Sequence, residues 1–117
     1  MSDLELRMIM LSTDHLEASI AFYVETLGMK LKFRDGDRFA AIDAGPITLA
    51  LATADDHPVP GEVALGIKAG DVDETAATIL AAGGSMVGAV ADGGHERRAI
   101  MRDSSGNAVV IYGPLRR

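Results

Sequence analysis

The side chains of this chain that could perform acid–base or metal chemistry include three histidines. His15 stands at a predicted helix start, His57 follows two aspartates in a segment that contains prolines, and His95 adjoins Glu96 in a glycine-rich turn. Histidine transfers protons near neutral pH and is a common metal ligand. Because all three lie in predicted loops, where polar side chains normally meet water, we expect solvated histidines and no site built on them.

Paired carboxylates and serines give no stronger signal. Asp35 and Asp37 flank a glycine in a predicted turn, and Asp71 stands three residues before Glu74, the spacing of a helix-capping box. Ser104 belongs to no motif that would supply a general base. Turns and helix starts therefore explain these residues, and the sequence identifies no catalytic residue.

Three arginines, Arg97, Arg98 and Arg102, lie on one predicted strand after the glycine-rich turn 92–95. Side chains alternate between the two faces of a strand, so Arg98 and Arg102 share one face and Arg97 lies on the other. At least one of them could face a ligand, but a solvated strand edge is the favoured interpretation. The turn is interpreted as a hairpin first, with a lid over a ligand as the alternative.

Composition limits the partners of the protein. Its 117 residues, 48% of them hydrophobic, suffice for one domain with a small core. The net charge of -6 argues against nucleic acid as a partner, because phosphate binding needs a basic surface. The absence of cysteine rules out disulfides, thiolate metal sites and a cysteine nucleophile. The N-terminal residues resemble neither a signal peptide nor a membrane span, so a cytoplasmic protein with no membrane partner is expected.

Hydrophobic spacing and turn residues predict the elements that position these side chains. Apolar residues at helical spacing predict a helix over 15–27, which Gly28 ends. The capping box at Asp71 and the pair Gly83–Gly84 bound a second helix. Short apolar or alternating runs predict the strands, which are 4–11, 30–34, 38–43, 46–52, 62–69, 85–91, 97–102 and 108–112.

The same order of elements, β-α-β-β-β, occurs twice. The first copy is the module 1–53, the second is the module 62–117, and a proline-rich connector, 54–61, joins them. A polar turn, 103–107, starts the last strand of the second copy. We therefore predict a single α+β domain, in which two tandem βαβββ modules form curved mixed sheets around a cleft with the helices outside.

The motifs of this chain resemble those of a known family. The segments that carry the resemblance are Ser19–Tyr23, Leu27–Met29, Asp71–Asp73, Ala82–Gly84 and Asp103–Asn107. They are similar to the vicinal oxygen chelate superfamily, which includes glyoxalase I, bleomycin-resistance proteins, extradiol dioxygenases and methylmalonyl-CoA epimerases. The resemblance covers nearly the whole chain and implies the fold. Since the superfamily spans enzymes and plain binding proteins, the function stays open.

For the metal-dependent members, the resemblance implies His, Gln or Glu ligands from the first and last strands of each module. The corresponding positions here are Met8, Ala50, Ala64 and Val110. Methionine is a soft ligand and the other three side chains bind no ion, so a hard divalent ion has no site at these positions. We expect no metal and no cofactor, with a displaced site or metal-free acid–base chemistry as the alternative.

Alternation along the strands also predicts which side chains face the cleft. The predicted ligand-binding residues are Met8, Met10, Thr48, Ala50, Ala64, Lys68, Val110 and Tyr112. Their small or flexible apolar side chains leave room for a ligand, and the few polar ones could orient it. For Lys68, near a strand end, an exposed ammonium is favoured. The alternative is that the whole set simply fills the space between the sheets.

Three functions are compatible with these residues. The leading hypothesis is metal-independent binding of a small, largely apolar or aromatic molecule in the cleft, with sequestration, as in the antibiotic-resistance branch, as the model. The second is a glyoxalase-, dioxygenase- or isomerase-like enzyme with a non-standard active site that uses Tyr112 or Lys68. The third is a non-catalytic structural or interaction module. The resemblance also implies a homodimer, because members of the superfamily are often dimers.

Overall fold

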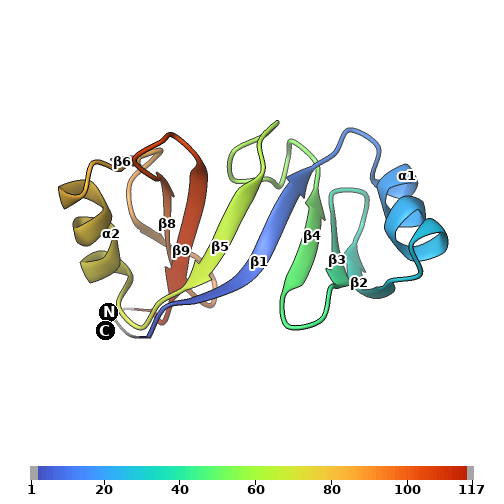
Figure 1. Ribbon diagram of the computed structural model, residues 1–117, viewed down its shortest axis with the longest axis horizontal. Coiled ribbons are helices and arrows are strands. Elements are labelled where there is room, and N and C mark those ends of the chain that lie inside the picture. The colour runs from blue at the N-terminus through green and yellow to red at the C-terminus, as the bar shows by residue number, and fades with distance from the viewer. Residues whose placement is uncertain (1–2, 116–117) are drawn as a thin grey trace. The chain divides into compact units, whose positions relative to one another are not determined.

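The computed structural model describes residues 3–115 and confirms the α+β class (Figure 1). The ends of the predicted modules, 1–2 and 116–117, lie outside the described residues. No helix within the described range is long and apolar enough to cross a membrane. The elements are β1 (Glu5–Ser12), α1 (Leu16–Ala21) continuing as the π-helical segment η1 (Phe22–Thr26), β2 (Lys30–Asp35), β3 (Phe39–Asp43), β4 (Thr48–Ala52), β5 (Ala64–Lys68), α2 (Val72–Ala81), β6 (Ser85–Met86), β7 (Ala91–Asp92), β8 (Arg97–Arg102) and β9 (Ala108–Gly113).

The chain folds into two compact units that repeat the β-α-β-β-β order. The N-terminal unit comprises residues 7–64, and the C-terminal unit comprises residues 65–115 with residues 3–6. In Figure 1 each helix lies beside the strands of its own unit. Each unit therefore has one sheet face covered by a helix and one face without a helix.

The sheet of the N-terminal unit is built from β1 to β4. β1 pairs with β4 in parallel, with Met8 opposite Thr48 and Met10 opposite Ala50, whereas β2, β3 and β4 pair antiparallel. The buried side chains of the core that includes the helix are Leu16, Ala40, Ile42 and Leu51. Because side chains alternate along a strand, the two Met8–Thr48 and Met10–Ala50 pairs lie on the opposite, helix-free face.

The first helix begins as predicted but ends differently. At Phe22 it widens into a π-helical turn, in which the Leu27 N–H donates to the Phe22 carbonyl at 3.1 Å. A wider turn rotates the following residues around the helix axis. Leu27, which the spacing predicts on the buried face, is consequently 53% exposed. Gly28 has a φ of 78° and ends the helix, as predicted.

The predicted connector, 54–61, lies within the N-terminal unit and contains the clearest departure from the sequence-based expectation. His57, expected to be solvated, is only 5% exposed. Its Nδ1 accepts the N–H of Val59 at 2.9 Å, so Nε2 carries the proton and donates to the Met10 carbonyl at 3.2 Å. Ser12 Oγ also donates to the Glu62 carbonyl at 2.7 Å. The connector thus folds back onto β1, and the histidine serves as a buried hydrogen-bonding link.

The sheet of the C-terminal unit has the order β5-β9-β8-β6, and β7 also pairs with β8. The predicted N-cap forms, because Asp71 Oδ1 accepts the N–H of Glu74 at 3.0 Å at the start of α2, which is one of the two hydrogen bonds of a capping box. The buried core that joins α2 to this sheet contains Ala69, Val72, Ala76, Ala99, Met101, Val109 and Ile111. Residues 99, 101, 109 and 111 therefore face the helix, and their neighbours in the strands face away from it.

The predicted strand 85–91 is wrong as a continuous element. Met86 pairs with Met101 and Ala91 pairs with Arg98, so four residues, 87–90, lie opposite only two, 99–100. The two extra residues form a bulge that divides the strand into β6 and β7. Gly88 lies in this bulge and offers no side chain for packing against a sheet, which favours an interruption there.

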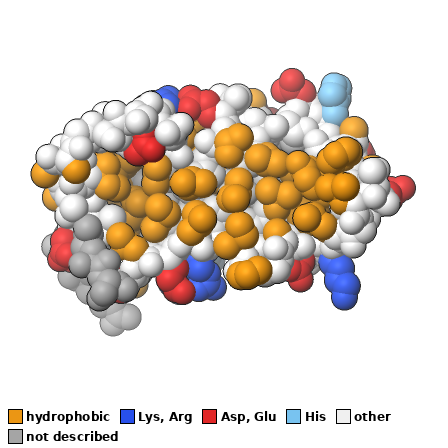
Figure 2. All heavy atoms as spheres, in the orientation of Figure 1, with side chains coloured by type: hydrophobic (Ala, Val, Ile, Leu, Met, Phe, Trp, Pro, Cys, Tyr) orange, Lys and Arg blue, Asp and Glu red, His pale blue; other side chains and the backbone are white. Residues whose placement is uncertain are grey.

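Figure 2 shows hydrophobic side chains exposed over the strands of each unit. Among the described residues, Phe33 and Val63 are large hydrophobic side chains that stay 55% and 56% exposed. The Phe33 ring lies 5.6 Å from that of Phe39, measured between centroids. Apolar surface of this kind is typical of a ligand or partner site.

The turn before β9 depends on one carboxylate. Asp103 Oδ1 accepts the N–H groups of Ser105 and Asn107, each at 2.9 Å, and Oδ2 accepts the Asn107 side-chain amide at 3.0 Å. Gly106 has a φ of 90°, as a turn of this kind requires. These bonds, that of the Asn107 side chain first, lower the pKa of Asp103 below its ordinary value.

We predict that the contribution of Asp103 to stability disappears in acid. Because its pKa is lowered in the folded state, the contribution is present above the unfolded-state pKa of about 4 and is lost as the pH falls through the lower folded-state pKa. Urea unfolding of wild type and Asp103→Ala should therefore show a stability difference at pH 7 that shrinks at pH 3. Asp55→Ala, which changes an exposed carboxylate of the connector, is the control. An equal difference at both pH values would refute the role of the turn.

We also predict that His57→Ala is among the more destabilising loop substitutions in this chain. It leaves the Val59 N–H and the Met10 carbonyl without their partner and opens a cavity, which should cost roughly 2–4 kcal/mol in free energy of unfolding. The matched control is His15→Ala, because His15 is exposed and should change stability by about 0.5 kcal/mol or less. Similar unfolding midpoints for the two variants would contradict the buried link.

Candidate functional site

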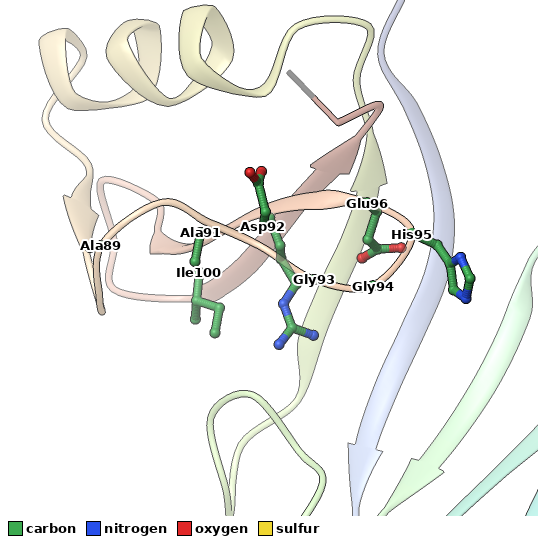
Figure 3. Close-up of a pocket in the computed structure, with 9 residues that line it drawn as sticks. Ala89, Ala91, Asp92, Gly93, Gly94, His95, Glu96 and Ile100 are labelled. Carbon is green, nitrogen blue, oxygen red and sulfur yellow. The ribbon is translucent and has the colours of Figure 1, made fainter. Parts of the chain in front are cut away.

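A cavity of about 380 Å³ lies against β7 and β8 in the C-terminal unit (Figure 3). Its apolar wall consists of Ala89, Ala91 and Ile100. Arg98 lines it from the same strand as Ile100, and the hairpin turn 93–96 forms its rim. Small-molecule sites in proteins typically have volumes of about 300–1,000 Å³ and mostly apolar walls with a few polar groups. The cavity fits this description at the small end.

The register of the strands places this cavity on the helix-free face. Ala91 is the direct partner of Arg98, and both belong to the set of residues that alternation turns away from α2. Ile100 follows two residues after Arg98 and lies opposite Val110 on β9. Figure 3 shows the side chains of Ile100 and Asp92 pointing to opposite sides of the sheet.

The other face of the same hairpin is fixed by Arg97. Its Nε and Nη2 donate to the two oxygens of Asp73 at 2.7 and 3.0 Å, and its Nη1 donates to Asp92 Oδ1 at 2.9 Å. These bonds, those to Asp73 first, raise the pKa of Arg97 above its ordinary value. Since Asp73 lies in the first turn of α2 and Asp92 on β7, one guanidinium joins helix, hairpin and β8. The hairpin that rims the cavity is thereby held in place.

The charged side chains that line the cavity are in a different state. Within residues 3–115, the side chains of His95, Glu96 and Arg98 form no hydrogen bond or ion pair. His95 and Arg98 are exposed, and Glu96 is partly buried. Asp92 also lines the cavity, but its carboxylate is bound by Arg97. The cavity therefore combines an apolar wall with Arg98 and Glu96, whose charges are not engaged by other side chains within residues 3–115.

Four of the predicted ligand-binding residues come together in the N-terminal unit. Met8, Met10, Thr48 and Ala50 form one patch on the helix-free face through the β1–β4 register. Met10 is 9% exposed and Ala50 is fully buried. The Thr48 hydroxyl accepts a hydrogen bond from Lys32 Nζ at 2.9 Å, so it is already engaged. Any contact of this patch with a ligand stays a prediction.

In the C-terminal unit, Val110 and Tyr112 lie on the same helix-free face as the cavity. Val110 is opposite Ile100 and Tyr112 is opposite Arg98, which makes both cross-strand neighbours of cavity residues. Lys68 is exposed at the end of β5, as its position suggests. Ala64, at the other end of that strand, is fully buried.

The four family positions do not fit a divalent metal. Met8, Ala50, Ala64 and Val110 offer one thioether and no nitrogen or oxygen donor from their side chains. Elsewhere in residues 3–115, no three His, Cys, Asp or Glu side chains gather in a group that could hold a metal ion. We therefore assign no chemical step to a metal at these positions.

The cavity residues Ala91, Arg98 and Ile100 are absent from the ligand-binding set predicted from sequence. The bulge at 87–90 brings Ala89 and Ala91 to one side of Ile100, and no sequence spacing announces such a bulge. The sequence contained one indication of this site, because strand alternation places Arg98 on the opposite face from Arg97. Within residues 3–115, Arg97 pairs with acidic side chains and Arg98 does not, and no sequence pattern indicates this difference.

Known proteins share both the sequence pattern and the fold. The family model of the Glyoxalase/Bleomycin resistance protein/Dioxygenase superfamily matches residues 5–111. An uncharacterized protein of Mycolicibacterium smegmatis is 56% identical over 117 residues, which are 100% of this chain and 100% of that protein.

Solved structures agree on the fold. A member of the same superfamily from Vibrio splendidus gives a TM-score of 0.73 at 14% identity and covers 94% of this chain and 98% of its own. The methylmalonyl-CoA epimerase of Streptomyces coelicolor, in complex with 2-nitronate-propionyl-CoA, gives a TM-score of 0.67 at 21% identity. The match covers 95% of this chain and 97% of the epimerase chain. At such identities the likeness shows the fold alone. The match of the family model across most of the sequence decides the family, and the chain belongs to the Glyoxalase/Bleomycin resistance protein/Dioxygenase superfamily, as its motifs predict.

Proposed function

We propose that this protein binds a small, largely apolar or aromatic molecule without a resident divalent metal, on the helix-free face of the C-terminal unit. The observation that carries the proposal is the cavity of about 380 Å³ with its apolar wall of Ala89, Ala91 and Ile100. Burial of an apolar ligand against such a wall is favourable by roughly 25 cal/mol per Å² of apolar surface removed from water. The wider cleft predicted from the sequence stays a prediction.

The metal-independent part of the proposal rests on donor chemistry. At the positions where the resemblance implies metal ligands, this chain has Met8, Ala50, Ala64 and Val110. A ligand site without a metal must gain its affinity from apolar contact and from the polar side chains at its edge. The cavity supplies both kinds of group, which supports reversible binding as its function.

Sequestration is the simplest form of such a function, because it requires binding alone. Tyr112, the candidate acid or base of the enzyme hypothesis, lies beside Arg98 on the neighbouring strand. Lys68 is exposed at a strand end, where its ammonium is solvated. The S. coelicolor epimerase of similar fold was solved with a bound small molecule, which supports ligand binding by this fold. The expected homodimer and cytoplasmic location stay predictions, and a cavity formed within one unit requires neither.

We predict that the neutral fluorescent probe N-phenyl-1-naphthylamine binds to this cavity and that Ala91→Phe weakens its binding by about tenfold or more. Ala91 is exposed and belongs to the cavity wall, so a phenyl ring at this position occupies ligand space without disturbing the core. Fluorescence titration measures the affinity. Ala77→Phe on the exposed side of α2 introduces the same ring away from the cavity and should leave binding unchanged.

Titration with and without EDTA tests the metal-independent part. Equal affinities are expected. Two results would overturn the proposal: unchanged probe binding in Ala91→Phe, or loss of binding in EDTA that a single divalent metal restores.

A further inference from the structure

Resting on the proposed function, we infer that the ligand is a small organic anion, with an acidic group such as a carboxylate or sulfonate held by Arg98 and an apolar body against Ala91 and Ile100. The inference follows from the different states of two adjacent arginines. Arg97 is ion-paired with the carboxylates of Asp73 and Asp92 on the helix side. Arg98 lies on the opposite face, lines the cavity and has no side-chain partner within residues 3–115.

The chemistry of a guanidinium selects the class of ligand. Arginine presents five N–H donors in a planar fork, stays charged, and matches the two oxygens of a carboxylate or two oxygens of a sulfonate or phosphate. Such charge-assisted bonds are about twice as strong as neutral ones. A neutral apolar ligand would leave these donors to water, whereas an anion of this shape would use them.

The position of Arg98 is favourable for binding because its backbone is held on both sides. It lies in the middle of three strands, paired with Ala91 on β7 and with Tyr112 on β9. This pairing fixes the backbone from which the side chain extends, so binding does not have to order the main chain at this position. Ala91 is only a methyl group, so the space beside the arginine stem stays open on that side.

The nearby acidic groups do not cancel this charge. The Asp92 carboxylate, next in sequence to Ala91, is turned to the other face and bound by Arg97. Glu96 does line the cavity, and its negative charge opposes an anion. It forms no ion pair with Arg98, which places its oxygens more than 4.0 Å from the guanidinium nitrogens. A bound anion would contact Arg98 directly and lie farther from Glu96 at the solvated rim, so attraction should exceed repulsion.

The opposite assignment, a cationic ligand held by Glu96, is less well supported. Glu96 precedes β8 and belongs to the hairpin turn, where its side chain is partly buried and its backbone carbonyl accepts from Gly93 at 2.6 Å. It therefore lacks the two-sided strand pairing that fixes Arg98. The two assignments predict opposite effects of neutralising each residue, which makes them separable by experiment.

The test compares two probes with the same aromatic body. N-phenyl-1-naphthylamine is neutral, and 8-anilino-1-naphthalenesulfonate adds one sulfonate. We expect wild type to bind the sulfonate about tenfold more tightly than the neutral probe. Arg98→Gln should remove most of this advantage, so that the affinity for the sulfonate falls much further than the affinity for the neutral probe. Arg98→Lys should restore part of it, because the charge returns without the planar fork. Glu96→Gln should tighten binding of the sulfonate severalfold.

Two controls complete the design. Arg38→Gln removes an exposed arginine of the N-terminal unit, ion-paired with Asp35, and should alter neither affinity. Ala91→Phe should weaken both probes if both occupy the cavity.

The possible failures are distinguishable. If neither probe responds to Ala91→Phe, the proposed function itself fails. If the neutral probe responds but Arg98→Gln leaves the sulfonate affinity unchanged, the anion inference fails and the proposed function stands. If Glu96→Gln weakens binding of the sulfonate, the inference is also wrong, because the carboxylate would then support the ligand rather than oppose it.

Discussion

The pleat of strand β8 is the constraint on which the C-terminal unit depends. Successive side chains of a strand point to opposite faces, so each residue of β8 belongs either to the helix side or to the cavity side. Ala99 and Met101 complete the core under α2, and Arg97 binds the carboxylates beside it. Arg98 and Ile100 are turned the other way by the same geometry. One strand thus separates the residues that complete the core from those that line the cavity.

The fold could be predicted because its local signals agree with its tertiary structure. The helix N-cap at Asp71, the helix end at Gly28 and the Asp103 turn all form where the sequence indicates. The two wrong expectations, the burial of Leu27 and the exposure of His57, share a physical cause. The exposure of Leu27 follows from a π-helical turn, and the burial of His57 follows from the connector folding back on β1. Both depend on hydrogen bonds that a pattern of polar and apolar residues does not contain.

The candidate site could be predicted only in part from the sequence. The family resemblance pointed to the first and last strands of each module, and the absence of donor side chains at positions such as Val110 can be read directly from the sequence. The sequence does not show that the Arg98 side chain lacks an acidic partner among the described residues. That property depends on which of the two neighbouring arginines pairs with Asp73, a residue 24 positions before Arg97. Strand alternation places Arg97 and Arg98 on opposite faces, and the position of α2 determines which of these faces lies beside Asp73. The sequence therefore predicts which residues of the strand share a face, but it does not predict the partners of the charged side chains on each face.

The bulge at 87–90 has a consequence for how the cavity could change. β6 and β7 each have their own register with β8, so the chain between them is not required to keep a fixed length for either pairing. Residues added or removed at 88–90 would alter one wall of the cavity while both ladders stay in place. Loop length at this point is an adjustable parameter, by which evolution or an engineer could fit larger or smaller ligands to an unchanged sheet.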